Sequence, residues 1–318
     1  MATSNMPSKK NKHSNPTVLR LSFECPAGGA TQFIDTALAL SIINRKFFRQ
    51  SPYFYINSVE VYNNEQAVVD IHTAPDNWCV RNSHSRGEMI WNKMNDLVEP
   101  PLSSGIKPKY HDFKVYLTDL HRTTGSLRPS MYGVNGSATT YTADDWVYSV
   151  FVSGDDDQDP VANADEFTAH LLGAHTGAAD NWSSIGLVES YENTRAQVST
   201  PSPITAGADL PIDPLVNIFD FSSEEQMNDI LTNLDEDNDA PPYNADNYVG
   251  SAGHMQHVAR IGTEVGLGRV GRAAGFCAPF GLICIDPHPL SGGGEQSSFR
   301  VVINIAAGSY KGVYAERA

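Results

Sequence analysis

The feature that most constrains the fold is a succession of short runs rich in β-branched and aromatic residues, separated by clusters of Gly, Pro, Asn and Asp. Such runs are typical of β-strands joined by turns. The runs expected to form strands are Val18–Phe23, Tyr53–Tyr62, Ala67–Ile71, Phe113–Leu117, Trp146–Val152, Leu215–Phe221, Phe276–Ile285 and Phe299–Ile305. The 25 Gly and 19 Pro residues favour antiparallel sheets with long loops over alternating strands and helices. We therefore predict an all-β protein.

Only two segments carry a helix signal. Each begins with a capping box, in which a Ser and the Glu three residues later bond to free backbone N–H groups. These boxes are Ser85 with Glu88 and Ser222 with Glu225, and apolar residues at helical spacing follow each of them. We expect one short amphipathic helix at each position, packed on a sheet.

An approximate internal repeat relates the two halves at an offset of about 130 to 137 residues. Its clearest anchor is the shared spacing of Glu, Tyr, Asn and Ala in the segments 60–67 and 189–196. A mostly β unit of this size suits a jelly-roll sandwich. The repeat predicts two jelly-roll β-sandwiches in tandem, a double jelly roll, each with one short inserted helix. The expected boundaries are a flexible arm at 1–16, sandwiches at 17–142 and 143–307, and a C-terminal tail at 308–318.

Charge is distributed unevenly along the chain. The formal net charge is −15, which argues against a surface built throughout to hold nucleic acid. Between Asp155 and Asp246 there are 20 acidic residues and one basic residue, so this stretch alone carries −19. The N-terminal arm has the opposite sign, with Lys9, Lys10 and Lys12 before any acidic residue. The arm either touches phosphates or lipid head groups, or serves as a solubilising tail.

Motifs for catalysis are missing from the sequence. There is no GxSxG, no CxxC among the four cysteines, and no HExxH among the ten histidines. The pair His254 and His257 lacks a nearby third ligand. The string Gly266-x-Gly268-x-x-Gly271 matches a dinucleotide fingerprint, but we expect a loop that leads into a strand, and no helix after it. We predict no catalytic residues, no metal ligands and no cofactor, and therefore no enzyme.

Two acidic segments have the ligand spacing of calcium loops. They are Asp155-x-Asp157-x-Asp159 with Glu166, and Asp235-x-Asp237-x-Asp239 with Asp246. Pro160 and Ala240 stand where such a loop needs glycine for its sharp turn. Solvated acidic loops are therefore the favoured interpretation.

Membrane insertion and secretion are not indicated. The longest nearly apolar stretch, Ala273–Ile285, has about 13 residues, whereas a spanning helix needs about 20. The N-terminus has no apolar segment of a signal peptide, so we expect synthesis and residence in a cytosol.

Several segments resemble a known family. They are Asn77-Trp-Cys-Val-Arg-Asn82 leading into Trp91 and Met94-Asn95, Lys107–Tyr116, Cys277–Ile285, and Val301–Val313. These segments resemble major capsid proteins of small tailless icosahedral viruses, above all the double-jelly-roll capsid proteins of single-stranded DNA phages with an internal membrane. The resemblance implies a structural protein that forms homotrimers. These would act as pseudo-hexagonal tiles of a virion shell and assemble in the host cytoplasm with other virion proteins. The short arm with Lys9, Lys10 and Lys12 would face an internal membrane or the viral DNA.

Other interpretations stay open at this point. A single jelly roll with large insertions, as in capsid proteins of small circular-DNA viruses, would serve the same function. A carbohydrate-binding or carbohydrate-active β-sandwich belongs to a different class, although no acid and base pair can be named for it. A secreted adhesin would need a signal peptide. Under the capsid interpretation Trp78, Trp146 and Trp182 lie either at subunit interfaces or in the sandwich cores, and the tail at 308–318 either reaches a neighbour or frays.

Overall fold

The computed structural model is mainly β, with 43% of the described residues in strands. It describes residues 15–64, 66–96, 109–134, 136–142, 145–152, 166–178, 181–195, 228, 231–232, 248–263, 270–289 and 297–317. Two units are distinguished: residues 1–191 with 249–318 form the first, and residues 192–248 form the second. In the second unit Asn228, Leu231 and Thr232 are helical, within the segment where the sequence predicts a helix.

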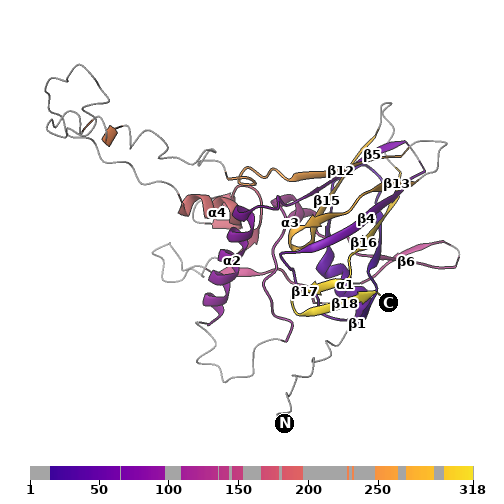
Figure 1. The fold of residues 1–318 in the computed structure, drawn as a ribbon, viewed down its shortest axis with the longest axis horizontal. Coiled ribbons are helices and arrows are strands. Elements are labelled where there is room, and N and C mark those ends of the chain that lie inside the picture. The colour runs from indigo at the N-terminus through magenta and orange to yellow at the C-terminus, as the bar shows by residue number, and fades with distance from the viewer. Residues whose placement is uncertain are drawn as a thin grey trace, which may run out of the picture. The chain divides into compact units, whose positions relative to one another are not determined.

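The first unit contains two large antiparallel sheets. One has the strand order β13-β4-β16-β2, and the other has the order β12-β5-β15-β3. The strands of the first sheet are β2 (Arg20–Cys25), β4 (Phe54–Tyr62), β13 (Val270–Ala273) and β16 (Phe299–Ile305), with β14 (Phe276–Ala278) also paired to β4. Those of the second are β3 (Gln32–Asp35), β5 (Ala67–Thr73), β12 (Gln256–Thr263) and β15 (Leu282–Pro289). Figure 1 shows the indigo strands β4 and β5 among the orange strands β15 and β16.

The two sheets pack face to face around one hydrophobic core, and we call this body the sandwich. Alternation along each strand produces the core, because successive side chains point to opposite faces of a sheet. In β16, Phe299, Val301 and Ile303 are buried in the core, whereas Arg300 and Asn304 lie on the outer face. Val69 and Ile71 of β5 close the core from the other sheet.

The tandem double jelly roll is not confirmed. Each large sheet contains strands from both sides of the predicted boundary at residues 142 and 143, so within the described residues neither predicted unit closes a large sandwich of its own. The clearest repeat anchor also fails. Glu60 and Tyr62 belong to strand β4, whereas the matching Glu189 and Tyr191 belong to helix α4 (Leu187–Thr194). The same letters at the same spacing form a strand in one place and a helix in the other, because tertiary packing overrides such short local preferences.

A long insertion, residues 74–255, separates β5 from β12. Its described helices are α2 (Trp78–Asp96), α3 (Asp119–Thr124) and α4, and its strands are β6 (Ser130–Tyr132), β7 (Ala138–Thr140), β8 (Val150–Val152), β9 (Glu166–His170), β10 (Thr176–Ala178) and β11 (Asn181–Gly186). The last four form a small sheet, and β6 pairs with β7. The insertion covers the outer face of β3, where His121 stacks on Phe33 at 4.9 Å and Leu127 N–H donates to the Phe33 carbonyl.

One predicted helix start was wrong. Helix α2 begins at Trp78, seven residues before the predicted start at Ser85. Asn77 caps it, because its Oδ1 accepts from Val80 N–H at 2.9 Å. The sequence also missed α1 (Thr36–Asn44), which Asp35 caps by accepting from Ala37 N–H and Leu38 N–H.

Three predicted strands were also altered. The run Trp146–Val152 is a strand only over Val150–Val152. The run Phe113–Leu117 forms only an isolated bridge. Two of its backbone N–H groups are bonded to side chains, since Lys114 N–H donates to Ser149 and Val115 N–H donates to Gln50, while Tyr116 N–H donates to the Ala169 carbonyl. The run Phe276–Ile285 is broken by the 3₁₀ turn η1 (Pro279–Gly281).

The first and last described segments are folded onto the sandwich. β1 (Asn15–Thr17) pairs in parallel with β18 (Val313–Arg317), which also pairs with β17 (Gly308–Tyr310). Tyr310, Val313 and Ala315 join the main core. The predicted tail at 308–318 is therefore ordered through Arg317, because its alternating apolar residues extend the core.

Candidate functional site

The insertion brings Ser126 and His121 together in a pair that looks like a nucleophile with its base. Their Oγ and Nε2 atoms are 2.7 Å apart. However, Leu117 N–H donates to His121 Nδ1, so the ring proton must sit on Nε2, and the histidine donates to the serine. Burial lowers the pKa of His121 to about 3, which keeps the ring neutral. A neutral imidazole that already carries its proton on the serine side cannot activate that serine.

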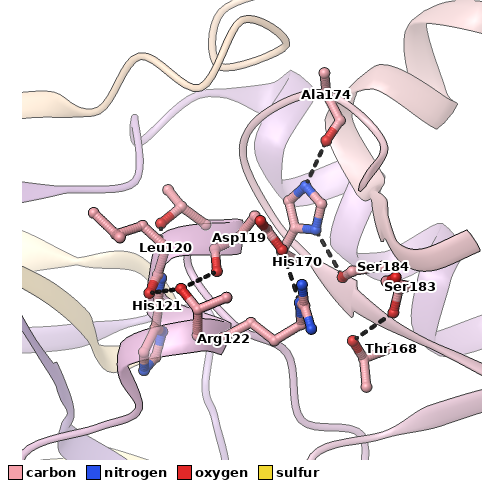
Figure 2. A network of polar contacts seen from close by, with 11 residues as sticks. Asp119, Leu120, His121, Arg122, Thr168, His170, Ala174, Ser183 and Ser184 are labelled. Atoms are coloured by element: carbon pink, nitrogen blue, oxygen red, sulfur yellow. Dashed lines mark hydrogen bonds and ion pairs between the residues drawn. The ribbon is translucent and has the colours of Figure 1, made fainter. Parts of the chain in front are cut away.

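A second Ser–His pair lies in the small sheet. Figure 2 shows His170 between Ser184, 2.8 Å from Nδ1, and the carbonyl of Ala174, 3.0 Å from Nε2. Nε2–H must donate to this carbonyl, so Nδ1 is the acceptor facing Ser184. This tautomer suits a base, but both side chains are fully buried, with 0% exposure. A serine without access to solvent or substrate serves here to join β9 to β11.

The polar contacts around Ser126 continue into the sandwich. Ser126 Oγ is 2.8 Å from the Tyr148 hydroxyl, which donates to Asp35 Oδ2 at 3.2 Å. Gln50 donates to the same oxygen and also bonds to both backbone groups of Val115. Burial raises the pKa of Asp35 to about 6, and its hydrogen bonds oppose this rise. This chain of contacts fastens the insertion to the start of α1.

The outer face of the second sheet carries charged side chains around Asp70. Arg260 bonds to both of its carboxylate oxygens at 2.7 Å, and His257 Nε2 lies 3.2 Å from Oδ1. The Arg260 hydrogen bonds lower the pKa of Asp70 to about 2. His257 therefore takes part in an ion-pair cluster. No group of three or more His, Cys, Asp or Glu side chains suited to holding a metal ion occurs within the described ranges.

The remaining sequence motifs fall partly or wholly outside the described residues. Gly271 lies within strand β13, so the glycine string runs into a strand, as the sequence predicts, and not into a nucleotide-binding helix. Both acidic calcium-like segments lie outside the described residues, except Glu166 in β9. Lys9, Lys10 and Lys12 also lie outside them.

The most exposed apolar side chain among those described lies at the tip of the β6–β7 hairpin. Val134 has an exposure of 107%, and Met131 on β6 is 42% exposed. All three residues of β7 are exposed, and the hairpin projects from the sandwich (Figure 1). Tyr132, the last residue of β6 before the turn, holds the hairpin to the sandwich, because its hydroxyl donates to Glu24 and Arg300 lies 3.5 Å from the centroid of its ring.

This hairpin was not predicted from the sequence. The dipeptide Asn135-Gly136 is a strong hairpin signal and could have identified it. A two-stranded hairpin with solvent on its faces is only marginally stable by itself, so its burial against another surface would be favourable.

A second group of exposed apolar side chains follows one side of α2. Trp78, Met89 and Ile90 are 45%, 51% and 42% exposed, while the opposite side of the helix is buried. Of the other tryptophans named in the sequence analysis, Trp146 packs against the main core and Trp182 is partly buried beside His175. Trp78 is thus the most exposed of these three tryptophans, and its ring also contacts that of Tyr191.

No helix within the described residues is long and apolar enough to cross a membrane. Comparison with protein families, curated proteins and solved structures finds no match to this chain. The function must therefore be inferred from the strand topology and the exposed surfaces of the chain.

Proposed function

We propose that this chain is a structural protein whose copies assemble into a virion shell. The observation that carries the proposal is the pair of strand orders, β2-β16-β4-β13 facing β3-β15-β5-β12. If the eight main strands of the sandwich are numbered in chain order, without β14, the first sheet has the order 1-8-3-6. The sheet that faces it has the order 2-7-4-5. This is the winding of an eight-stranded jelly roll, an architecture found in viral capsid proteins, lectins and cupins.

Two features favour the capsid class among these. The interior of the sandwich is filled by large side chains such as Phe23, Phe54 and Phe299, and this packing leaves no room for the interior ligand of a cupin. The projecting hairpin and the exposed side of α2 supply apolar contacts of the kind that interfaces use. A lectin would bind its ligand through surface loops, which a packed interior does not exclude. A test of self-association is therefore needed to decide between a capsid protein and a lectin.

The structure favours the single jelly roll with a large insertion over the tandem form. A trimer that acts as a pseudo-hexagonal tile needs two sandwiches in each subunit. The insertion contributes the four-stranded sheet β10-β11-β9-β8, in which β9 and β11 pair in parallel, and this differs from the strand order of the sandwich. We therefore propose one sandwich per subunit, as in capsid proteins of small circular-DNA viruses. The expected location is the virion, after assembly in the host cytoplasm with other virion proteins.

The first experiment asks whether the full-length chain self-associates. Sedimentation velocity and negative-stain microscopy should show closed particles or their symmetric building blocks. A chain that remains monomeric over a wide range of protein and salt concentrations contradicts the proposal, and binding to a glycan array would then support the lectin alternative.

The hairpin provides a sharper form of this test. Val134→Asp should abolish or strongly reduce association, because it places a charge at a site that must lose water on contact. Val134→Ile, which keeps the side chain apolar, should assemble like the natural chain. Equal assembly of both variants would remove the hairpin from the interface.

A further inference from the structure

An open groove of about 670 Å³ runs along the outer face of the first sheet. Its floor is formed by the middle of β4 and the end of β16, and β1, β13 and β18 contribute to its walls. Twelve residues line the groove; three of them, Arg20, Arg272 and Arg317, are arginines and one, Glu60, is acidic, so we call it the arginine groove.

Glu60 holds two of the arginines in place and still leaves N–H groups of both available to a ligand. Its Oε2 accepts from Arg20 at 3.0 Å, and its Oε1 lies 3.7 Å from Arg272. The side chains of Arg20 and Arg272 remain 57% and 67% exposed, and each guanidinium has five N–H groups to donate. Both therefore keep donors directed at solvent while the carboxylate fixes their positions.

Neutral donors lie between the arginines. Asn304 donates through Nδ2 to Ser58 Oγ at 3.0 Å, and Arg272 donates to the same oxygen at 3.4 Å. The third guanidinium, that of Arg317, comes from β18 where this strand pairs with Thr17 of β1. The groove thus combines guanidinium, amide and hydroxyl groups, which are the side chains that contact phosphate oxygens in protein–nucleic acid complexes.

The sign of the charge in this groove opposes that of the whole chain. The lining carries three positive side chains and one negative side chain, in a chain whose formal charge is −15. The segment that bears Lys9, Lys10 and Lys12 joins the described chain at β1, whose Thr17 lines the groove.

We propose that the arginine groove binds the phosphodiester backbone of a nucleic acid. The choice of this ligand rests on the proposed function, since a shell must hold a genome. No aromatic side chain lines the groove, so it offers charge and hydrogen bonds but no surface on which bases could stack. Binding is therefore insensitive to base sequence and strongly dependent on salt.

The test measures fluorescence anisotropy of a labelled oligothymidine with the full-length chain at increasing salt concentrations. The variant Arg20→Gln with Arg272→Gln and Arg317→Gln should bind at least about tenfold more weakly, because it loses charge-assisted contacts to phosphate. Each lost contact should reduce the slope of log affinity against log salt by about 0.7, and hence by about 2 for all three. The matched control is Arg128→Gln, which removes one exposed arginine outside the groove lining.

Three outcomes would overturn the proposal. The first is an unchanged affinity and salt slope in the triple variant with its thermal unfolding also unchanged. The second is an equal loss in the Arg128→Gln control. The third is binding of an acidic peptide with the sequence of residues 155–166, but not of oligothymidine, since the groove would then be a docking site for acidic protein segments. If the triple variant fails to fold, Arg317→Gln alone, at the last described residue, should still lower the slope by about 0.7.

Sedimentation of the same samples separates this proposal from the proposed function. Chains that bind oligothymidine through the groove but never associate would contradict shell assembly alone. Particles that form without groove-dependent binding would contradict the groove alone.

Discussion

The sandwich and the insertion bury different kinds of side chain. Every fully buried member of the main core cluster lies in β-rich segments before residue 72 or after residue 260, outside the insertion. The histidines show the contrast most clearly. His257 and His288 lie exposed on the sandwich, whereas His84, His121 and His170 are buried in the insertion. The sandwich is thus held mainly by apolar packing, while the insertion depends on imidazoles that must stay neutral.

This difference teaches where each region is vulnerable. Apolar packing is indifferent to pH but sensitive to lost volume. A buried neutral histidine fits its site only while solvent does not force a proton onto it. Substitutions that remove buried volume should therefore destabilise the sandwich most, and a fall in pH should destabilise the insertion first.

The largest expected effect is that of a cavity in the sandwich. Phe299 on β16 is 1% exposed, and Phe299→Ala should lower the free energy of unfolding by about 3 to 5 kcal/mol. Phe167→Ala is the matched change in the insertion, where this partly buried ring stacks on Phe151 at 5.7 Å. Phe167→Ala should lower the free energy of unfolding clearly less than Phe299→Ala does. Urea unfolding followed by circular dichroism measures both, and equal costs would remove the distinction between the two regions.

The sandwich was also the region most accessible to sequence reasoning. β16 was predicted with its observed bounds, and β4 to within one residue, because alternation of buried and exposed residues is a local signal. The strands that were missed lack that signal. β3 is buried at every position, and β12 contains His257, Arg260 and Gly262, which are not typical strand residues.

The insertion and the groove depend on contacts that no local pattern encodes. The run Phe113–Leu117 appears strand-like, but Gln50, 65 residues before Val115, bonds to both backbone groups of Val115. Arg20, Arg272 and Arg317 come from three distant segments and meet only because β1, β2, β13 and β18 converge. The acidic stretch and the three lysines of the N-terminal arm are plain in the sequence, and the roles predicted for them remain predictions.

The next effect is a dependence of stability on pH. His84 stacks on Phe280 at 3.9 Å, and its Nε2 has no hydrogen-bond partner among the described residues. Burial lowers its pKa from 6.5 to about 3. Below about pH 6.5 this histidine is protonated in the unfolded chain but stays neutral in the folded chain. Its full contribution to the free energy of unfolding is therefore present above this pH and decreases as the pH falls. At pH 5 the loss should be about 2 kcal/mol for this histidine alone.

His84→Phe isolates this contribution. Phenylalanine keeps the stacking on Phe280 and cannot take a proton, so the variant should lose less stability than the natural chain between pH 7 and pH 5. Thermal melts at several pH values measure the difference, in which the opposite contribution of Asp35 cancels. Parallel stability curves for His84→Phe and the natural chain would mean that this histidine is not a source of acid sensitivity in the insertion.

The smallest expected effect concerns the helix that opens the insertion, and it separates two assignments of its first residue. If α2 begins at Trp78, then Asn77→Ala removes the acceptor of Val80 N–H and should cost about 1 kcal/mol. Ser85 then lies exposed in the middle of the helix, and Ser85→Ala should be neutral or slightly stabilising, because alanine has the higher helix propensity. Denaturant midpoints of the two variants give the answer directly. The reverse ranking would restore the capping box at Ser85, and residues 78–84 would then no longer belong to the helix that brings His84 onto Phe280.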